Sequence, residues 1–225
     1  MPKVSWFGGL ICAGFLVAGF APAMAQQFSA DIVMARDSAV VPAGRLWVRD
    51  GRVRIETPEL PNGFFLVDSA KPSAYFVRPA THIYMDARQS SRFSQLFVAV
   101  DPNEPCRRWQ AMAELAGLTG KADWRCEQAG QEEIKGRGAE MFRVTSAGSH
   151  QFVAWLDRER RFPLRIKTAD GTVIALEHIR DEAQPASLFE LTPDFRKFSP
   201  EALIDRIKQS DVWVDEPGEN GSLHR

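Results

Sequence analysis

The chain has 225 residues, of which 25% are charged and 44% hydrophobic, and these proportions exclude disorder along the whole length. Lys and Arg number 28 against 29 Asp and Glu, and the resulting net charge of −1 provides no electrostatic footprint for nucleic acid or an anionic membrane surface. The 14 prolines and 16 glycines favour many short elements over a few long helices.

The first 25 residues have the pattern of a cleaved secretory signal peptide. Lys3 gives a positive start, Trp6 to Phe20 is uncharged and apolar, and Ala23-Met24-Ala25 places small residues where a signal peptidase reads. The apolar stretch is about 15 residues long, whereas about 20 are needed to span a bilayer. We therefore expect an exported mature chain that begins at Gln26 and is not an integral membrane protein.

Short strands are predicted from Phe28 to Asp86, beginning with Phe28 to Ala35. Asp50-Gly51 tolerates positive φ at both turn positions and predicts a hairpin between Gly44 to Arg49 and Arg52 to Thr57. Because strand side chains alternate, pairing outward from this turn puts four apolar residues on one face. These residues are Leu46, Val48, Val53 and Ile55.

The other face of this hairpin is polar. There Arg45 is expected opposite Glu56, and Trp47 opposite Arg54. A surface cation–π contact between Trp47 and Arg54 is favoured over a recognition site. A second hairpin is predicted between Gly63 to Asp68 and Ser73 to Arg78, and a short strand from His82 to Asp86 follows it.

A helix is predicted after Asp101. Asn103 is a suitable cap and Pro105 is tolerated in the first turn, while Gly117 ends the run. Four apolar residues recur at helical spacing. They are Trp109, Met112, Ala113 and Ala116.

Cys106 and Cys126 are the two cysteines of the expected mature chain. An even pair in an exported protein indicates a disulfide, which closes a loop of about 20 residues and contributes about 3 kcal/mol in the chain-entropy model. A redox-active pair is the disfavoured alternative, because these cysteines lack Cys-x-x-Cys spacing. The disulfide is expected to join the helix to a strand from Trp124 to Gln128.

Strands resume towards the C-terminus, and a last helix is predicted from Ser199-Pro200, with a stripe of Leu203, Ile204 and Ile207. Residues 215–225 have the composition of a flexible tail, and we expect one domain over residues 26–214. The predicted strands are Ala139 to Thr145, His150 to Asp157, Phe162 to Thr168, Thr172 to Ile179 and Ser187 to Leu191.

No catalytic or metal-binding motif is present in the sequence. The histidines, His82, His150, His178 and His224, have no second His or Cys at a spacing that would place two ligands on one face. Nucleophile-elbow, phosphate-loop and His-Glu-x-x-His patterns are also missing. We therefore expect no enzyme activity, no metal and no cofactor.

Several segments together resemble the periplasmic outer-membrane lipoprotein carrier (LolA-like) superfamily. They are GRLWVRDGRVRIE from Gly44, FFLVD from Phe64, AYFVRP from Ala74, IYMD from Ile83, FVAWLDRERRFPLRIKT from Phe152 and SLFELTPDFRKF from Ser187. These weak motifs are spread over most of the mature chain. Their order along the sequence is similar to that in an uncharacterised subtype of the superfamily.

The resemblance implies a mainly β fold of the α+β class. Its antiparallel sheet of about eleven strands curves into an incomplete barrel with a helical lid. A curved sheet with an apolar inner face must bury that face against helices, a ligand, or both. The candidate lining is Leu46, Val48, Val53, Ile55, Phe65, Val67, Phe76, Ile83 and Met85.

Two functional hypotheses follow from the resemblance and the sequence. The first is a non-catalytic carrier that holds a lipid, an acyl chain or a lipid-modified protein in the concave face. The alternative is a periplasmic protein-interaction or envelope-sensing module whose core is filled by its own side chains. An unrecognised hydrolase is a third and weaker hypothesis, and the sequence does not predict the oligomeric state.

Overall fold

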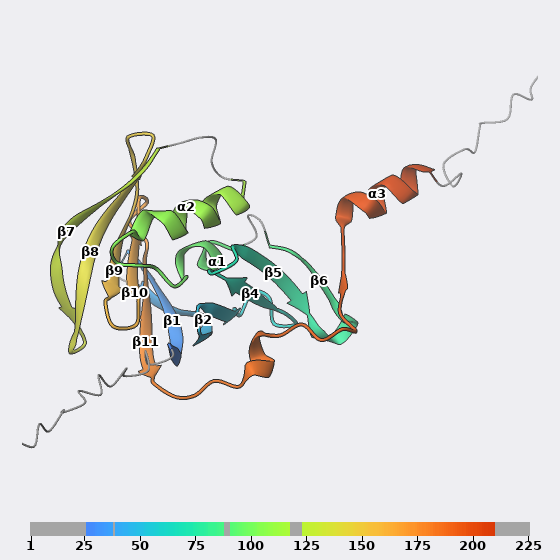
Figure 1. Cartoon of the computed structure of the whole chain (residues 1–225), viewed down its shortest axis with the longest axis horizontal. Coiled ribbons are helices and arrows are strands. Elements are labelled where there is room, and N and C mark those ends of the chain that lie inside the picture. Colours follow the sequence, from blue (N-terminus) through green and yellow to red (C-terminus); the bar gives the residue numbers. More distant parts are fainter. Residues whose placement is uncertain (1–25, 38, 88–90, 118–122, 210–225) are drawn as a thin grey trace, which may run out of the picture.

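The computed structural model describes residues 26–37, 39–87, 91–117 and 123–209 (Figure 1). The predicted signal peptide, residues 1–25, and the predicted tail, residues 215–225, lie outside the described residues.

The described residues form one 12-stranded sheet, in the order β12-β6-β5-β4-β3-β2-β1-β11-β10-β9-β8-β7. Neighbouring strands are antiparallel except β12, which runs parallel to β6. The strands are β1 (Gln27–Arg36), β2 (Ala39–Arg49), β3 (Arg52–Glu56), β4 (Phe64–Asp68), β5 (Ser73–Arg78), β6 (Ile83–Asp86), β7 (Trp124–Ile134), β8 (Arg137–Ser146), β9 (Ser149–Asp157), β10 (Phe162–Thr168), β11 (Val173–Arg180) and β12 (Arg196–Lys197).

The sheet is bent but not closed, since β12 and β7 form its two ends and do not pair with each other. Helices α1 (Phe93–Leu96) and α2 (Pro105–Leu115) lie between the two halves of the bent sheet (Figure 1). We call the side of the sheet that they cover the helix face and the opposite side the outer face. The predicted incomplete barrel with covering helices is confirmed, with one strand more than the resemblance implied.

The predicted register of the first hairpin is confirmed. Leu46 pairs with Ile55 and Val48 with Val53. The side chains of these four residues are fully buried on the helix face. In an antiparallel sheet with one buried face, a shift of one residue in the pairing would move every side chain to the opposite face. The register set by the turn therefore fixes which residues of β2 and β3 enter the core.

Helix α2 presents its predicted apolar residues to the core, where Trp109 and Met112 are 2% and 1% exposed. The prediction that Asn103 caps this helix is wrong. The capping position is Glu104, which makes no side-chain cap hydrogen bond, and the backbone N–H of Asn103 donates instead to Asp101 Oδ1 at 3.0 Å. Pro105 follows in the first turn, where its missing N–H costs no helical hydrogen bond.

The predicted disulfide between Cys106 and Cys126 is present and joins α2 to β7. The two Cα atoms are 5.5 Å apart, a normal separation for this cross-link. The bond therefore attaches the helix that covers the sheet to the strand at one end of that sheet.

A segment that we call the C-terminal strap, residues 185–197, packs on the outer face of β3–β6. The predicted strand from Ser187 to Leu191 is wrong, because the strap forms the 3₁₀ helix η2 (Ala186–Phe189) there. Phe189 is buried against Phe64, Leu66 and Val77 of the sheet. Side-chain packing onto the face, and not ladder hydrogen bonding at an edge, thus holds this part of the strap.

Helix α3 (Pro200–Gln209) follows the strap and projects away from the sheet (Figure 1). The predicted helix is confirmed, but Leu203 and Ile204 of its apolar stripe are 45% and 50% exposed. The side chain of Ile207 lies outside the described residues. None of the helices in the described part of the chain is long and apolar enough to cross a membrane.

Gly44 allows β2 to bend where it leaves β3. Its φ is +150°, and a Cβ there would lie 2.2 Å from the carbonyl oxygen of Glu56. We expect Gly44→Ala to lower the free energy of unfolding by about 2 kcal/mol, measured by urea denaturation, since neither backbone can move away cheaply. Gly138→Ala is the matched control, because nothing lies within 4 Å of a Cβ at Gly138. Equal stability of the two variants would contradict this account.

Candidate functional site

Six of the nine predicted ligand-binding residues lie together in the main core, each no more than 1% exposed. The other three lie on β5 and β6 and are partly exposed. The buried six are Leu46, Val48, Val53, Ile55, Phe65 and Val67, and the remaining three are Phe76, Ile83 and Met85. Binding of a ligand by these nine residues stays a prediction.

Side chains of the chain itself fill the helix face opposite these residues. Trp109 stacks edge-on against Phe152 with ring centroids 5.1 Å apart, and its indole Nε1 donates a hydrogen bond to the Leu96 carbonyl at 3.1 Å. Phe97 packs on Phe162 at 6.3 Å. All of these residues are buried or nearly so, and they belong to the same cluster as the six predicted residues.

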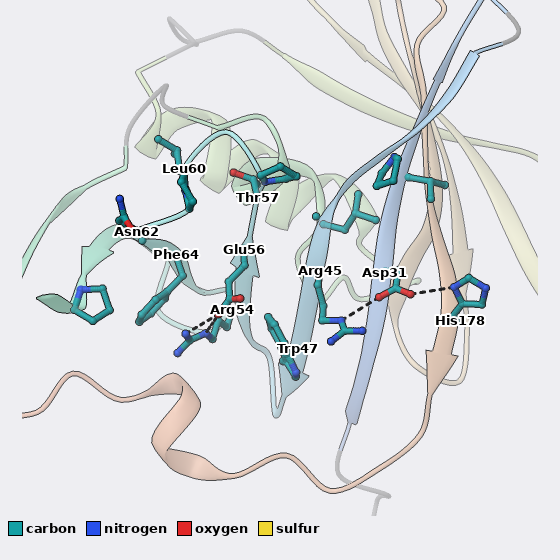
Figure 2. A pocket seen from close by; sticks show the side chains of 18 of the residues that line it. Asp31, Arg45, Trp47, Arg54, Glu56, Thr57, Leu60, Asn62, Phe64 and His178 are labelled. Atoms are coloured by element: carbon teal, nitrogen blue, oxygen red, sulfur yellow. Dashed lines mark hydrogen bonds and ion pairs between the residues drawn. The ribbon is translucent and has the colours of Figure 1, made fainter.

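An open pocket of about 880 Å³ lies on the outer face, between the turn that contains Leu60 and Asn62 and His178 of β11 (Figure 2). Its floor comes from residues of β1–β4 that alternate with the buried core residues, and its far wall is the turn from Thr57 to Gly63. The side chains that define it are Asp31, Arg45, Trp47, Arg54, Glu56, Thr57, Leu60, Asn62, Phe64 and His178.

Arg54 organises the floor of this outer-face pocket. Its guanidinium lies 3.6 Å from the centroid of the Phe64 ring and 5.9 Å from that of Trp47. Glu56 Oε1 accepts hydrogen bonds from Arg54 Nε at 3.0 Å and from Nη2 at 2.7 Å. The predicted contact between Trp47 and Arg54 is confirmed, but the shorter stacking partner is Phe64 on the next strand.

The second polar group of the pocket surrounds Asp31 on β1. Asp31 Oδ1 accepts a hydrogen bond from Arg45 Nε at 3.0 Å, and Oδ2 lies 3.0 Å from His178 Nδ1. Burial raises the pKa of Asp31, but hydrogen bonds from Arg45 and His178 and the charges of Arg45 and Arg180 outweigh it, so that pKa lies below its ordinary value. Asp31 is therefore a carboxylate at neutral pH.

Removing this carboxylate has a pH-dependent effect. Since the folded pKa of Asp31 is below 3.8, its ion pairs stabilise the fold above that pH, and the contribution is lost as the pH falls through the lower folded value. We expect Asp31→Asn to cost up to about 1 kcal/mol at pH 7 and progressively less below pH 4. Urea unfolding at several pH values measures this. Asp37→Asn, at a carboxylate whose side chain is 96% exposed, should leave stability unchanged throughout.

The described residues contain no group of three or more His, Cys, Asp or Glu side chains that could hold a metal ion. His178 pairs with Asp31, and His82 pairs with Asp194 while stacking on Phe195 at 5.3 Å. Both histidines are more than half exposed and each is engaged by a carboxylate. These contacts attach neighbouring strands and the strap to each other.

Sequence reasoning assigned four of the pocket residues, Arg45, Trp47, Arg54 and Glu56, to the polar face of the first hairpin and not to a site. Strand alternation does place Arg45, Trp47 and Arg54 on one face, and that signal was available. The turn from Pro58 to Asn62 was also predicted from the sequence. The approach of His178 to Asp31 was not, because Asp31 and His178 are 147 positions apart.

The architecture is therefore that of an open, helix-covered β-sheet with a pocket on its outer face. The sequence matches no protein-family model. It also matches no curated protein.

Three solved structures are similar in arrangement. An uncharacterized conserved protein from Thermus thermophilus shares 12% identity over 78% of this chain and 91% of that chain, with a TM-score of 0.43. MucB shares 17% identity over 75% of this chain and 58% of that chain, with a TM-score of 0.41. A DUF1329 family protein from Desulfovibrio piger shares 14% identity over 77% of this chain and 92% of that chain, with a TM-score of 0.36. At these values the similarities identify no ligand or partner, and membership of the LolA-like superfamily stays a prediction.

Proposed function

We propose that the chain is an exported, non-catalytic interaction module that binds a partner protein through the outer-face pocket. The observation that carries this proposal is the contrast between the two faces of one sheet. The helix face is filled by the chain's own residues, including Trp109 and Phe97, whereas the outer face has an open pocket of about 880 Å³.

The chemistry of the pocket supports a macromolecular partner. Trp47 is half-buried and offers aromatic surface, and the neighbouring Arg54, which packs on the buried ring of Phe64, is already oriented by Glu56. Aromatic residues and Arg are the types enriched where protein interfaces carry most of their binding energy. Because Glu56 holds Arg54 in place, little side-chain entropy is lost when a partner covers it.

Site-specific photocrosslinking tests this function. A photoreactive phenylalanine analogue at Leu60, in the pocket wall, should give a covalent adduct of defined mass in the envelope of the native host. The same analogue at Leu115 is the matched control, since Leu115 is also exposed, at 39% against 37% for Leu60, but lies on α2. Trp47→Ala should abolish the Leu60 adduct. Adducts of equal yield at both positions, or none at Leu60, would contradict the proposal.

Lipid or lipoprotein carriage is the second candidate function. It is supported by the continuity of the apolar helix face, where the predicted ligand residues from Leu46 to Val67 lie beneath α1 and α2. A guest would have to displace those helices, and α2 is attached to β7 through Cys106 and Cys126. Saturable one-to-one binding of a fluorescent dodecanoyl probe to the purified chain would support carriage. Absence of probe binding, together with a Leu60 adduct, would favour the interaction module.

A further inference from the structure

Strand β2 has a free edge over half of its length. It pairs with β1 from Ala39 to Arg49, but with β3 only from Arg45 to Arg49. The segment from Ala39 to Gly44 thus has a strand partner on one side only within the described part of the sheet. A backbone edge of this kind is a template for another extended chain.

The outer-face pocket occupies the place where β3 would continue beside this free edge. β3 ends at Glu56, and the chain then turns away through hydrogen bonds from Leu60 N–H to the Thr57 carbonyl and from Gly63 N–H to the Leu60 carbonyl. Pro42 and Gly44 of β2 line the pocket, and so do Thr57 and Leu60, which lie across it from Arg45 of β2 in Figure 2. The space beside the free edge is therefore already open.

Exposed apolar side chains are present both on the free edge and in the wall of the pocket. Val40 and Val41 on the free edge are 63% and 45% exposed, and Leu60 on the facing wall is 37% exposed. They are three of the six large hydrophobic side chains that stay exposed among the described residues. A free strand edge flanked by apolar side chains is a binding site for an extended segment that brings apolar side chains of its own.

The charges of the pocket are already paired. Arg45 and His178 contact Asp31, and Arg54 contacts Glu56, so each of the five ionisable lining residues has a partner of the opposite kind. A charged guest would have to break one of these pairs. The pocket therefore fits a segment without charge.

We infer that an extended, uncharged segment of a partner protein adds as a strand to the free edge of β2 at Ala39–Gly44. This inference rests on the proposed function and specifies how the partner is held. A segment of about six residues, about 20 Å long, matches this edge. Its backbone groups bond to β2, and its side chains alternate between the two faces of the sheet, so that one set lies beside Val40 and the other beside Val41, and the set that enters the pocket faces Leu60. Pro42 has no N–H, so its carbonyl is its only contribution to the new ladder.

A displayed library of random octapeptides, selected on the full chain, tests the inference. Enriched peptides are expected to carry apolar residues at alternate positions and no charge. Two synthetic versions of an enriched peptide are methylated at one or the other alternating set of backbone nitrogens, since only one set faces β2 in an added strand. One version should bind at least tenfold more weakly, measured by fluorescence anisotropy, because the methyl groups remove its N–H donors to β2. Binding of both methylated versions equal to that of the unmethylated peptide, or no enrichment, would overturn strand addition.

Two proline variants locate the binding edge. Successive N–H groups of a strand point to opposite sides, so one of Val40→Pro and Val41→Pro removes an N–H bonded to β1, and the other removes one that faces the pocket. The variant that keeps the stability of the native chain should lose peptide binding at least tenfold. Leu60→Lys, in the opposite wall, should do the same, while the matched control Leu115→Lys should bind as the native chain does.

The same variants separate this inference from the proposed function. If the Leu60 photocrosslink to the partner persists in the well-folded proline variant and is lost in Trp47→Ala, the pocket binds its partner without strand addition. If neither variant changes the crosslink, the proposed function fails as well. A concentration-dependent dimer in sedimentation that the well-folded proline variant abolishes would identify a second copy of the chain as the added strand, which overturns the inference of a separate partner.

Discussion

Replacing both cysteines, as Cys106→Ser with Cys126→Ser, should lower the free energy of unfolding by about 3 kcal/mol. The cross-link spans 20 positions, and its loss releases the unfolded chain from a closed loop. The folded state also loses the covalent attachment of α2 to β7. This strand lies at the end of the sheet and pairs only with β8 among the described strands. Urea unfolding of the native and double-serine chains measures the difference directly.

The single variants and a reducing agent serve as controls for this prediction. Cys106→Ser and Cys126→Ser should each cost nearly as much as the double variant, since either one opens the loop. Dithiothreitol should destabilise the native chain and leave the double-serine chain unchanged. If the double variant unfolded at the native urea concentration, the cross-link would contribute nothing and α2 would be held by packing alone.

Local sequence signals were sufficient to predict the hairpins and their faces. Asp50-Gly51 fixes the turn, and a fixed turn determines that Leu46 lies opposite Ile55. Helix α2 was equally accessible, because Trp109 and Met112 repeat at the helical period. Each of these features depends on residues that are close together in the chain.

Contacts between distant parts of the chain could not be predicted in this way. The pairing of β1 with β11 brings His178 to Asp31, and no pattern near either residue indicates it. The strand predicted from Ser187 failed for a related reason. Its apolar residues indicated a short strand, but Phe189 is buried against the outer face of distant strands, and packing decided the local conformation.

The candidate site illustrates the same limit. Burial of Leu46 and Val53 follows from alternation, but alternation does not say whether a ligand or a helix covers them. In the structure α1 and α2 cover this face. The pocket lies where Gly44 turns β2 away from β3, and only the facing Glu56 backbone reveals why a glycine is needed there.

Trp109→Ala should have the largest effect of any substitution considered, a loss of about 3–5 kcal/mol in the free energy of unfolding. Trp109 is 2% exposed, its ring packs edge-on against Phe152 at 5.1 Å, and its Nε1 donates to the Leu96 carbonyl at 3.1 Å. The truncation leaves a cavity at the centre of the helix face and a carbonyl without its donor. Urea unfolding monitored by far-ultraviolet circular dichroism measures the loss.

Trp109→Phe separates the two contributions, since it keeps a ring against Phe152 and removes the donor to Leu96. It should cost about 2 kcal/mol, less than the alanine variant. Native-like stability of Trp109→Ala would mean that α2 does not fill the helix face, and the carrier function would then gain support. A large loss of stability, with dodecanoyl probe binding only in the alanine variant, would instead mean that Trp109 itself occupies the space a lipid would need. The outer-face pocket would then be the remaining site for a partner.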